Sequence, residues 1–596
     1  MTAPSPVTAD TTLVTFAIKL AGTEIDSTYE VKSVEVRKAI NKVSYAEIEI
    51  FDGSPSAGDF PISNKADFLP GAEIEIEAGY NSTNTTIFKG VITSQGLQIG
   101  QSEGSLLKVI CRDKAIKMTL GRKSAFFQEK KDSDIISTLI GDSGATADVE
   151  ATTLEHPNIS QYYVTDYDFM LMRADVNGMV VIVDDGTVSV KPPDTSTTAV
   201  ITVAYGESML DFDAQLNSIN QIDSATGYAW DMSTQALAEG SGSASATTPG
   251  NVTNSTLAEV VGLSDFVLQS PGNIVADELT AWASAKLLKS KISKIDGSVS
   301  FQGSALVKPG VMITLAGVGD RFNGDAYVTA VEHSIVDGDW VTKASFGLNF
   351  EWFEEETPNV NAPPASGLLA SVSGLQTGVV MEINEDPDGE FRVKIKLPIM
   401  QQDADGVWAR YAQFYGTSGA GSFFYPEVDD EVVVGFLNDD PRYPVILGML
   451  YSSSISPPYT PDADNYTKAI VTKEKLKVVF NEEDKSIQII TPGENQMMLD
   501  DNDGSILIQD QNDNKIEMSS SGITIKSASN LTIEAAQAVT IKGGTDVKLE
   551  ATSKMSLKGL QFEATADTTA KVAGNASAEI SASGTTTVKG AMVMIN

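Results

Sequence analysis

The sequence lacks most of the residues from which metal centres and disulfide frameworks are built. Cys111 is the only cysteine, and His156 and His333 are the only histidines among 596 residues. A single cysteine cannot form a disulfide within the chain, and neither histidine has a cysteine nearby. We therefore expect no metal, no cofactor and no disulfide in this chain, and we expect His333 to pack in a core.

Positive charge and long apolar runs are also scarce. The chain has 42 Lys and Arg against 80 Asp and Glu, a net charge of −38. This charge disfavours nucleic acid and anionic membranes as partners, and it fits a solvated acidic surface or docking onto basic proteins. The longest aliphatic runs, such as 179–183, fall far short of the ~18–20 residues of a membrane helix. Residues 1–10 lack the features of a signal peptide, so we expect synthesis in the cytoplasm.

Familiar catalytic motifs are missing as well. The sequence contains no Walker phosphate loop, no G-x-S-x-G elbow and no H-E-x-x-H zinc motif. Asp and Glu are so numerous that a pair of them means nothing without geometry. We predict that the chain is not an enzyme.

The residues that are abundant favour β-structure. Glycine occurs 48 times, and Thr, Val, Ile and Ser are frequent, which favours strands and turns over helices. Segments 43–51 and 72–78 alternate apolar and charged residues, as half-buried strands do. Segments 132–140 and 273–292 are the helix candidates, the second with Asn273 as its N-cap.

Two polar segments rich in proline, 354–374 and 452–465, lack hydrophobic periodicity and indicate domain boundaries. They separate a large N-terminal region, a compact middle module and a C-terminal region. After the second boundary, turn residues divide a series of short predicted strands that form a meander. These strands lie near 475–480, 487–490, 497–499, 506–508 and 516–518.

An eight-residue repeat begins at Ile523 and defines the C-terminal region. Its apolar residues come in pairs two positions apart, which indicates strands with one buried face. After one residue of slippage the repeat resumes at Ala564, Val572, Ile580 and Val588. The predicted core residues are Ile523, Ile525, Leu531, Ile533, Val539, Ile541, Val547, Leu549, Met555 and Leu557.

Two architectures fit this repeat. One chain could wind three octads per coil into a parallel β-helix of about three coils, or three chains could intertwine, each supplying one face per level. The intertwined prism leaves no free lateral strand edge, and we favour it. Its roughly nine octads, rising ~4.8 Å each, would give a needle about 45 Å long.

The residues that follow the apolar pairs support the intertwined arrangement. They alternate in charge, whereas identical charges stacked between chains would repel each other. Chance alternation of surface lysine and glutamate is the other explanation. The ladder residues are Lys526, Glu534, Lys542, Glu550 and Lys558.

Residues 376–451 resemble the OB-fold module of VgrG proteins, the spikes of type VI secretion and related phage-like particles. The pattern W-x-R-x-A-Q … F-x-P-E-V-x-D-E-V-x-V-x-F … D-P-x-x-P-x-I-x-G is matched, except that Asp429 and Asp439 stand where the family has glycine. Asp tolerates left-handed turn geometry, so we expect both turns to form. The motif residues expected to be structural are Trp408, Arg410, Pro426, Glu427, Asp430, Glu431, Asp440 and Pro441.

The N-terminal region carries a second resemblance. Segments 159–190 and 308–335 are similar to stretches of phage baseplate hub and late-control proteins. This resemblance implies paired β-barrel-like domains in a threefold ring. OB-folds can also bind oligonucleotides or sugars, but the module lacks the dense basic groove with interleaved aromatics that single-strand binding requires.

The resulting fold class is mainly β: a hub of β-barrel-like domains with minor helices, a central OB-fold and a C-terminal intertwined trimeric β-helix. The expected domains are the hub at 1–360, with an α/β insert at about 116–210, a linker at 361–375, the OB collar at 376–455, a linker and β-meander at 456–520, and the needle at 521–596.

The resemblance implies a structural spike, a homotrimer that joins tail tube and baseplate proteins to a membrane-piercing tip and contacts the target membrane mechanically. It also implies a PAAR-repeat tip protein, which often carries its own metal, with effector cargo as a further candidate partner. The residues expected to bind the tip protein are Met592, Met594, Ile595 and Asn596. Particle incorporation, followed by exposure or delivery outside the cell, is the expected location.

Enzymatic spikes place a domain before or after the needle. The 72 residues from Tyr451 to Ile523 are too few for a typical catalytic domain of ~100 residues, and the sequence ends directly after the last repeat. The alternative function is a trimeric phage-type fibre that binds a receptor or carbohydrate, which would require an exposed aromatic-rich terminal domain.

Overall fold

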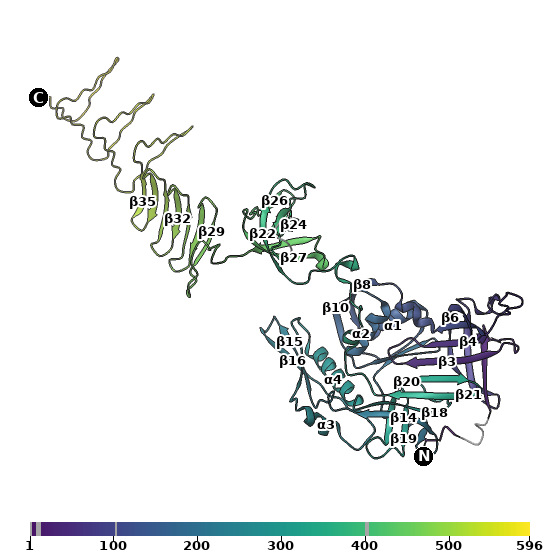
Figure 1. Cartoon of the computed structure of the whole chain (residues 1–596). Coiled ribbons are helices and arrows are strands. Elements are labelled where there is room, and N and C mark those ends of the chain that lie inside the picture. Colours follow the sequence, from purple (N-terminus) through teal and green to yellow (C-terminus); the bar gives the residue numbers. More distant parts are fainter. Residues whose placement is uncertain (1–2, 8–12, 102–103, 400–404, 596) are drawn as a thin grey trace. The chain divides into compact units, whose positions relative to one another are not determined.

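A computed structural model describes residues 3–7, 13–101, 104–399 and 405–595 (Figure 1). The chain divides into two units, Met1–Leu450 and Tyr451–Asn596, and each is described by itself. Strands dominate both units, which confirms the mainly β fold class. Within the described ranges, no helix is long and apolar enough to span a membrane.

The largest element of the first unit is a sheet of 13 strands. Along its main path the strands run β14-β18-β21-β20-β3-β4-β7-β6-β5-β1-β2, and β19 joins β13 to β20. The strands are β1 Val14–Leu20, β2 Thr23–Glu24, β3 Val31–Ala39, β4 Tyr45–Phe51, β5 Glu73–Tyr80, β6 Thr83–Gly100, β7 Gly104–Arg112, β13 Thr202–Ala204, β14 Met209–Leu216, β18 Ile295–Gln302, β19 Met312–Ala316, β20 Gly324–Val336 and β21 Asp339–Phe346.

This sheet carries two separate hydrophobic cores. One is centred on β3–β7 and includes Ile48 and Phe88, and the other is centred on β18–β21 and includes Phe301. The two parts join where β3 pairs with β20, from Ala39 opposite Ala330 to Ser33 opposite Val336. The resemblance implies paired β-barrel-like domains here; among the described residues the N-terminal strands share one continuous sheet with two cores, and only the middle module closes a barrel.

Two helices and two small sheets form an insert between β7 and β13. Helix α1, Asp132–Ser143, confirms the helix expected at 132–140, and α2 spans Asp166–Val176. Both helices contribute to one core with the strands β11 and β12. The strands are β8 Lys123–Lys131, β9 Thr146–Val149, β10 Glu155–Val164, β11 Val180–Asp184 and β12 Thr187–Lys191.

A second α/β layer follows β14. Helix α4, Ala276–Ile292, packs on the three-stranded sheet β16-β15-β17, while α3 spans Asn254–Val261 and α5 spans Phe353–Glu356. The predicted N-cap Asn273 is wrong: the extended residue Val275 precedes the first turn and no side chain caps it. Acidic Asp277 and Glu278 occupy this turn, where the helix dipole favours negative charge. The strands are β15 Ala225–Asp231, β16 Ala236–Ser241 and β17 Phe266–Ser270.

Arg122 fastens the segment that leaves the N-terminal region. Its guanidinium donates to the carbonyl oxygens of Val360 (3.0 Å) and Asn361 (2.7 Å), and also to that of Asn359. Val360 is buried in the core of the insert. The start of the predicted boundary segment 354–374 is therefore bound to the first unit.

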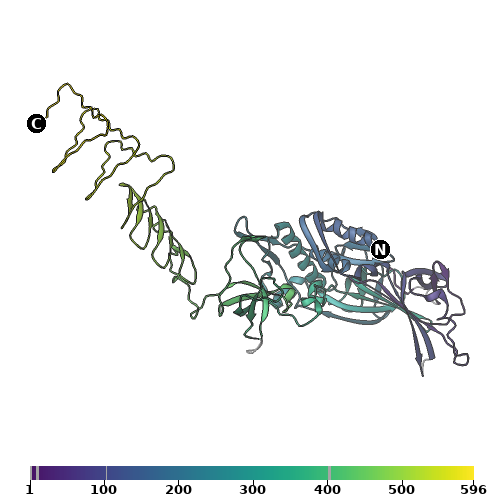
Figure 2. The same ribbon diagram turned by 90° about the horizontal axis from the view of Figure 1, so that it is seen from above.

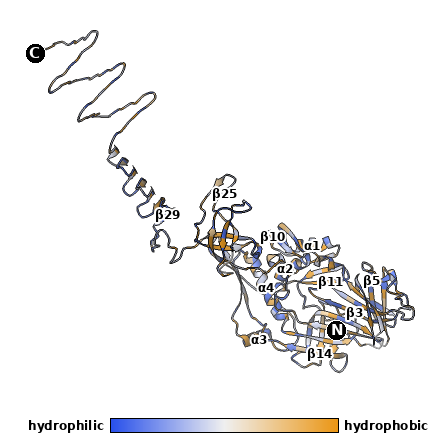
Figure 3. Cartoon of the chain, turned by 45° about the horizontal axis from the view of Figure 1, so that its top comes forward, coloured by the Kyte–Doolittle hydropathy of each residue, from blue (hydrophilic) through white to orange (hydrophobic). Residues whose placement is uncertain are grey.

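The middle module is a closed five-stranded barrel in the order β22-β23-β24-β28-β27, as the OB-fold prediction requires. Its strands carry hydrophobic residues, coloured orange in Figure 3, and enclose a core that includes Val393 and Val432. Asp429 and Asp439 have φ values of 74° and 56°, which confirms that both turns form without glycine. The strands are β22 Gln376–Glu382, β23 Val393–Lys396, β24 Val407–Tyr411, β27 Glu431–Phe436 and β28 Pro444–Met449, with a hairpin of β25 Gly416–Thr417 and β26 Ala420–Gly421.

The second unit begins as a seven-stranded antiparallel meander, in which each strand pairs with the next (Figure 2). Its strands contain four of the five that the sequence predicted in this region and overlap the fifth, 475–480, from Lys477 onward. Beyond the last strand, residues 527–595 form no strand within one chain. The strands are β29 Thr467–Val471, β30 Lys477–Asn481, β31 Ser486–Ile490, β32 Gln496–Asp500, β33 Ser505–Gln509, β34 Lys515–Ser519 and β35 Gly522–Lys526.

Candidate assembly site

The meander presents two columns of apolar side chains on one face. Strand pairing sets Ile487 opposite Leu499 and Leu499 opposite Ile506, and it continues in this way across the sheet. Opposed residues in an antiparallel pair point to the same side, so each column lies on a single face. The first column is Phe480, Ile487, Leu499, Ile506, Met518 and Ile523, and the second is Ile470, Val478, Ile489, Met497, Ile508, Ile516 and Ile525. We call these thirteen residues the columnar face.

No core covers the columnar face within one chain. Ile506 is 37% exposed and Ile523 is 70% exposed. Among the described residues of this unit, the only buried side chain is that of Asp500, a carboxylate. Contiguous exposed apolar surface of this kind is typical of sites that contact another molecule.

The predicted needle core residues continue this pattern. All ten are between 50% and 70% exposed in a single chain. The backbone bends at eight-residue intervals, at 528–529, 536–537, 544–545, 552–553 and 560, and then at 567–568, 575–576 and 583–584. This regular bending matches the eight-residue period of the sequence, and the bends shift by one position after 560, near the shift of the apolar residues at Ala564.

The predicted tip residues do not form a pocket in one chain. Met592, Met594 and Ile595 are 79%, 82% and 91% exposed. Asn596, the fourth predicted tip residue, lies outside the described residues. The tip assignment therefore stays a prediction.

The OB motif residues lie on barrel strands and in the turns between them. Trp408 and Arg410 are on β24 and Glu431 begins β27, while Pro426, Glu427 and Asp430 precede β27 and Asp440 and Pro441 precede β28. Asp430 accepts a 2.8 Å hydrogen bond from the Glu427 amide, and Asp440 accepts from the Arg442 guanidinium at 2.6 Å. The Arg442 hydrogen bond lowers the pKa of Asp440. These contacts shape turns, as the predicted structural role of Asp430 and Asp440 requires.

Exposed aromatic residues on the barrel were not anticipated from the sequence. Phe391, Phe414 and Phe423 are all more than 80% exposed, and the Phe423 and Tyr425 rings lie 5.1 Å apart. Arg392, the nearest cation in sequence to Phe391, is held by Asp386 at 2.6 Å. The guanidinium beside Phe391 in sequence is thus already paired with a carboxylate.

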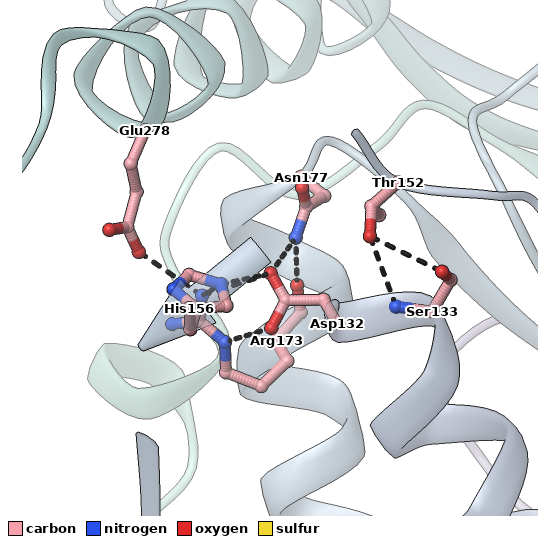
Figure 4. A network of polar contacts seen from close by, with 7 residues as sticks. All are labelled: Asp132, Ser133, Thr152, His156, Arg173, Asn177 and Glu278. Carbon is pink, nitrogen blue, oxygen red and sulfur yellow. Dashed lines mark hydrogen bonds and ion pairs between the residues drawn. The ribbon is translucent and has the colours of Figure 1, made fainter. Parts of the chain in front are cut away.

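A buried polar network in the insert resembles a catalytic constellation (Figure 4). Asp132 accepts hydrogen bonds from Arg173 at 2.7 Å and from Asn177 at 2.9 Å, and it lies 3.1 Å from Nε2 of His156. Burial alone would raise the pKa of Asp132, but the Arg173 guanidinium outweighs burial and lowers it. Arg173 also contacts Glu278 of α4 at 3.1 Å.

This network acts as a clamp. It joins α1, β10, α2 and α4, and its carboxylate is saturated by donors. Among the contacts of the described residues, no hydroxyl or thiol reaches His156. The Cys111 thiol is buried in another core, and burial raises its pKa to about 12, so it is protonated at neutral pH.

His333, in contrast, packs in the large sheet as expected. Its Nδ1 lies 2.9 Å from the hydroxyl oxygen of Thr342, and its ring contacts Trp340. Neither histidine belongs to a metal-binding arrangement within the described ranges.

The N-terminal region and the middle module each match a known protein family. Residues 10–337, more than half of the chain, match the family described as the Alg8 N-terminal domain. Residues 376–451 match the type VI secretion system/phage-baseplate injector OB domain.

Individual relatives cover less of the chain. It is 35% identical over 121 residues to the type VI secretion system spike protein VgrG3 of Vibrio cholerae, covering 20% of this chain and 11% of that protein. It is 30% identical over 210 residues to VgrG1a of Pseudomonas aeruginosa, covering 32% of each. The chain thus spans between 11% and 32% of the length of these two relatives.

Among solved structures, the 43 kDa tail protein of prophage MuSo2 from Shewanella oneidensis aligns with 56% of this chain and 98% of its own, at 12% identity and a TM-score of 0.42. This chain therefore combines matches to two domain families, over 10–337 and 376–451, with sequence identity to known spike proteins. The chain belongs to the family of VgrG and phage-baseplate spike proteins, with an Alg8 N-terminal domain ahead of its injector OB domain.

Proposed function

We propose that this chain is the central spike of a contractile, phage-tail-like injection system. It joins the tail tube and baseplate to a tip that pierces the target membrane, and it acts through shape and stiffness without catalysing a reaction. The observation that carries the proposal is the apolar repeat after the OB domain, which no part of the same chain covers.

In the proposed assembly, three copies share one axis. Residues 1–360 form the hub, 376–455 the collar and 521–596 an intertwined needle in which the ten predicted core residues meet their counterparts. The pairs two positions apart and the bends at eight-residue intervals support this arrangement. A trimeric prism closes every lateral strand edge, which removes a site of aggregation.

The proposed partners follow from the two ends of this assembly. The hub docks on tail tube and baseplate proteins, and residues 590–596 of three copies bind a PAAR-repeat tip protein that carries any metal itself. Exposed Met592, Met594 and Ile595 support an apolar contact there. The protein is made in the cytoplasm and leaves the cell as part of the particle.

Two measurements test this function. Light scattering of the full-length chain is expected to give about 190 kDa, three times the chain mass of 63.3 kDa. A chain ending at Lys589 is expected to remain trimeric and to lose binding of the tip protein. A stable 63.3 kDa species would contradict the trimer, and undiminished tip binding by the shortened chain would contradict the tip assignment.

One observation favours carbohydrate binding as a second candidate function. Phe391, Phe414 and Phe423 expose aromatic rings on the barrel, and such rings can stack on sugar faces. Co-sedimentation with peptidoglycan or cell-wall polysaccharide tests it, with the Phe414→Ala, Phe423→Ala double variant as the comparison. Binding that disappears in the variant would support this role, whereas no binding by either protein would exclude it for these polymers.

A further inference from the structure

The first unit contains a pocket with more positive than negative side chains in its walls. The pocket has a volume of about 680 Å³, and residues of β3, β7 and α2 contribute to its lining. Its described lining residues include Arg37, Lys42 and Arg112 but a single carboxylate, that of Asp168. The whole chain has 42 basic against 80 acidic residues, so this local excess of positive charge runs against the composition. We call this site the cationic pocket.

Two of its three cations have no carboxylate partner among the described residues. The Arg112 guanidinium lies over the Tyr45 ring, 4.5 Å from the ring centroid, and Lys42 is exposed. A guanidinium stacked on an aromatic ring keeps its in-plane N–H groups available, and these groups match the two oxygens of a carboxylate. Arg37, in contrast, is paired with two glutamates at 2.8 and 3.2 Å.

The backbone around Lys42 is fixed by the insert. The amide of Asn41 donates to the carbonyl oxygen of Val181 at 2.6 Å, and its side-chain oxygen accepts from the Val181 amide at 2.8 Å. The buried Ser44 hydroxyl donates to the carbonyl oxygen of Val183 at 2.5 Å. Because this turn is held in place before any ligand binds, binding there costs less conformational freedom.

The rest of the lining is mainly apolar and includes one unsatisfied donor. Tyr167 is 4% exposed, and its hydroxyl has no hydrogen-bond partner among the described residues. Burial raises the pKa of Tyr167, so the hydroxyl keeps its proton. A buried donor of this kind is normally satisfied by a bound group or by ordered water. The apolar lining residues are Ala39, Val43, Ile110, Ile116, Leu171 and Phe353.

An acidic peptide segment with one bulky apolar side chain carries the groups that this lining matches. Its carboxylates can pair with the two free cations, and its apolar side chain can cover the apolar lining. A small inorganic anion would match the charge but would leave the apolar lining uncovered. The volume of the pocket lies within the ~300–1,000 Å³ that is usual for ligand sites.

We propose that the cationic pocket is a docking site for an acidic segment of another protein that inserts an apolar side chain. Lys42 and Arg112 bind its carboxylates, while the acidic remainder of the surface repels it and so favours this one site. The inference goes beyond the proposed spike function. It does not depend on a trimer, because every wall of the pocket described above belongs to one copy.

Selection of short random peptides on the full-length protein tests this proposal. We expect the selected peptides to carry Asp or Glu next to Leu, Ile or Phe. Fluorescence anisotropy of one such labelled peptide then measures its affinity for the protein. Inorganic phosphate is expected to displace the peptide no better than chloride does at the same ionic strength, because phosphate cannot fill the apolar part of the pocket.

Lys42→Glu and Lys130→Glu are matched variants for the affinity measurement. Both residues are exposed and both changes alter the charge equally, but Lys130 lies outside the pocket. We expect Lys42→Glu to bind the peptide at least about tenfold more weakly than wild type, and Lys130→Glu to bind it as wild type does. Equal affinities of the two variants, selected peptides without acidic residues, or failure to select any peptide would overturn the proposal. Displacement by phosphate beyond that by chloride would also overturn it, in favour of a site for small anions. A monomeric wild type would contradict the trimeric spike alone.

Discussion

The two units of this chain use apolar residues in opposite ways. In Met1–Leu450 such residues gather in several cores that a single copy buries completely, with Ile48 and Phe301 fully inaccessible. In Tyr451–Asn596 the apolar residues are arranged in columns and octads, and the described part buries none of them. The first unit can therefore be stable alone, whereas in the proposed trimer the second unit gains stability by association.

This difference indicates that stability and association depend on different segments of the chain. Stability of a unit with its own core does not depend on protein concentration, whereas stability gained by association does. Substitutions in the first unit should change its unfolding and leave the oligomeric state intact. Substitutions in the second should do the reverse.

The largest effect is expected in the buried polar network of the first unit. Asp132→Ala leaves the Arg173 guanidinium without its main partner, and breaking a buried ion pair typically costs about 3–5 kcal/mol. We expect the free energy of unfolding to fall by about that amount, measured by urea titration, with no change in mass by light scattering.

Lys191→Ala is the control for this prediction. Lys191 and Asp148 form an exposed pair, with side chains 46% and 47% accessible, and such pairs contribute about 0–1 kcal/mol. Equal losses in both variants would contradict the role of the network as a clamp.

Acid should weaken the first unit through His333. Burial, together with repulsion from Lys38 and Lys308, lowers the pKa of His333 to about 3. Between its ordinary pKa of about 6.5 and this lowered value, the unfolded chain binds a proton that the folded chain does not. Stability therefore falls as the pH falls, by up to about 1.4 kcal/mol per pH unit.

The control is His333→Gln, which removes the titrating ring. Urea unfolding at about pH 7 and about pH 5.5 should show a smaller loss for the variant than for wild type. The second unit contains no histidine, so association through it should lack this contribution. An identical loss in both proteins would show that other groups cause the acid sensitivity.

Local patterns allowed a good part of both units to be predicted. Alternation and turn residues indicated the meander strands, and the helix candidate at 132–140 is helix α1. The OB turns at Asp429 and Asp439 formed as chemistry suggested. These features depend on neighbouring residues, which a sequence displays directly.

Pairings between residues far apart in the sequence could not be predicted from local patterns. β3 pairs with β20 across almost 300 residues, so nothing local reveals that the N-terminal strands share one sheet. Arg122 and the Val360 carbonyl are 238 residues apart in the sequence. Apolar pairs of the columnar face, such as Ile487 and Ile489, can be seen in the sequence. Because the meander pairs are unequally spaced along the chain, the sequence does not show that this face continues into the octads.

A moderate, local effect is expected where the first unit holds the outgoing chain. Arg122→Ala removes donors to the carbonyls of Val360 and Asn361, and hydrogen bonds from charged groups contribute about 1.5–3 kcal/mol. We expect faster proteolytic cleavage within 357–374 and little change in global unfolding. Cleavage at the wild-type rate would show that Val360 burial alone holds the segment.

The smallest effect should come from the charge ladder of the needle. In the intertwined arrangement, Glu534 and Glu550 lie beside lysines of neighbouring chains, and exposed pairs contribute only about 0.2–1 kcal/mol each. The Glu534→Lys, Glu550→Lys double variant places like charges at every level near Lys526, Lys542 and Lys558. We expect the trimer to resist detergent less than wild type, most clearly at low salt, because salt screens the repulsion.

Glu579→Lys, a change of the same charge outside the ladder, is the control. Equal resistance of the ladder variant and wild type at every salt concentration would refute the stacking between chains. Association of the chains would then depend on their apolar contacts, which salt does not screen.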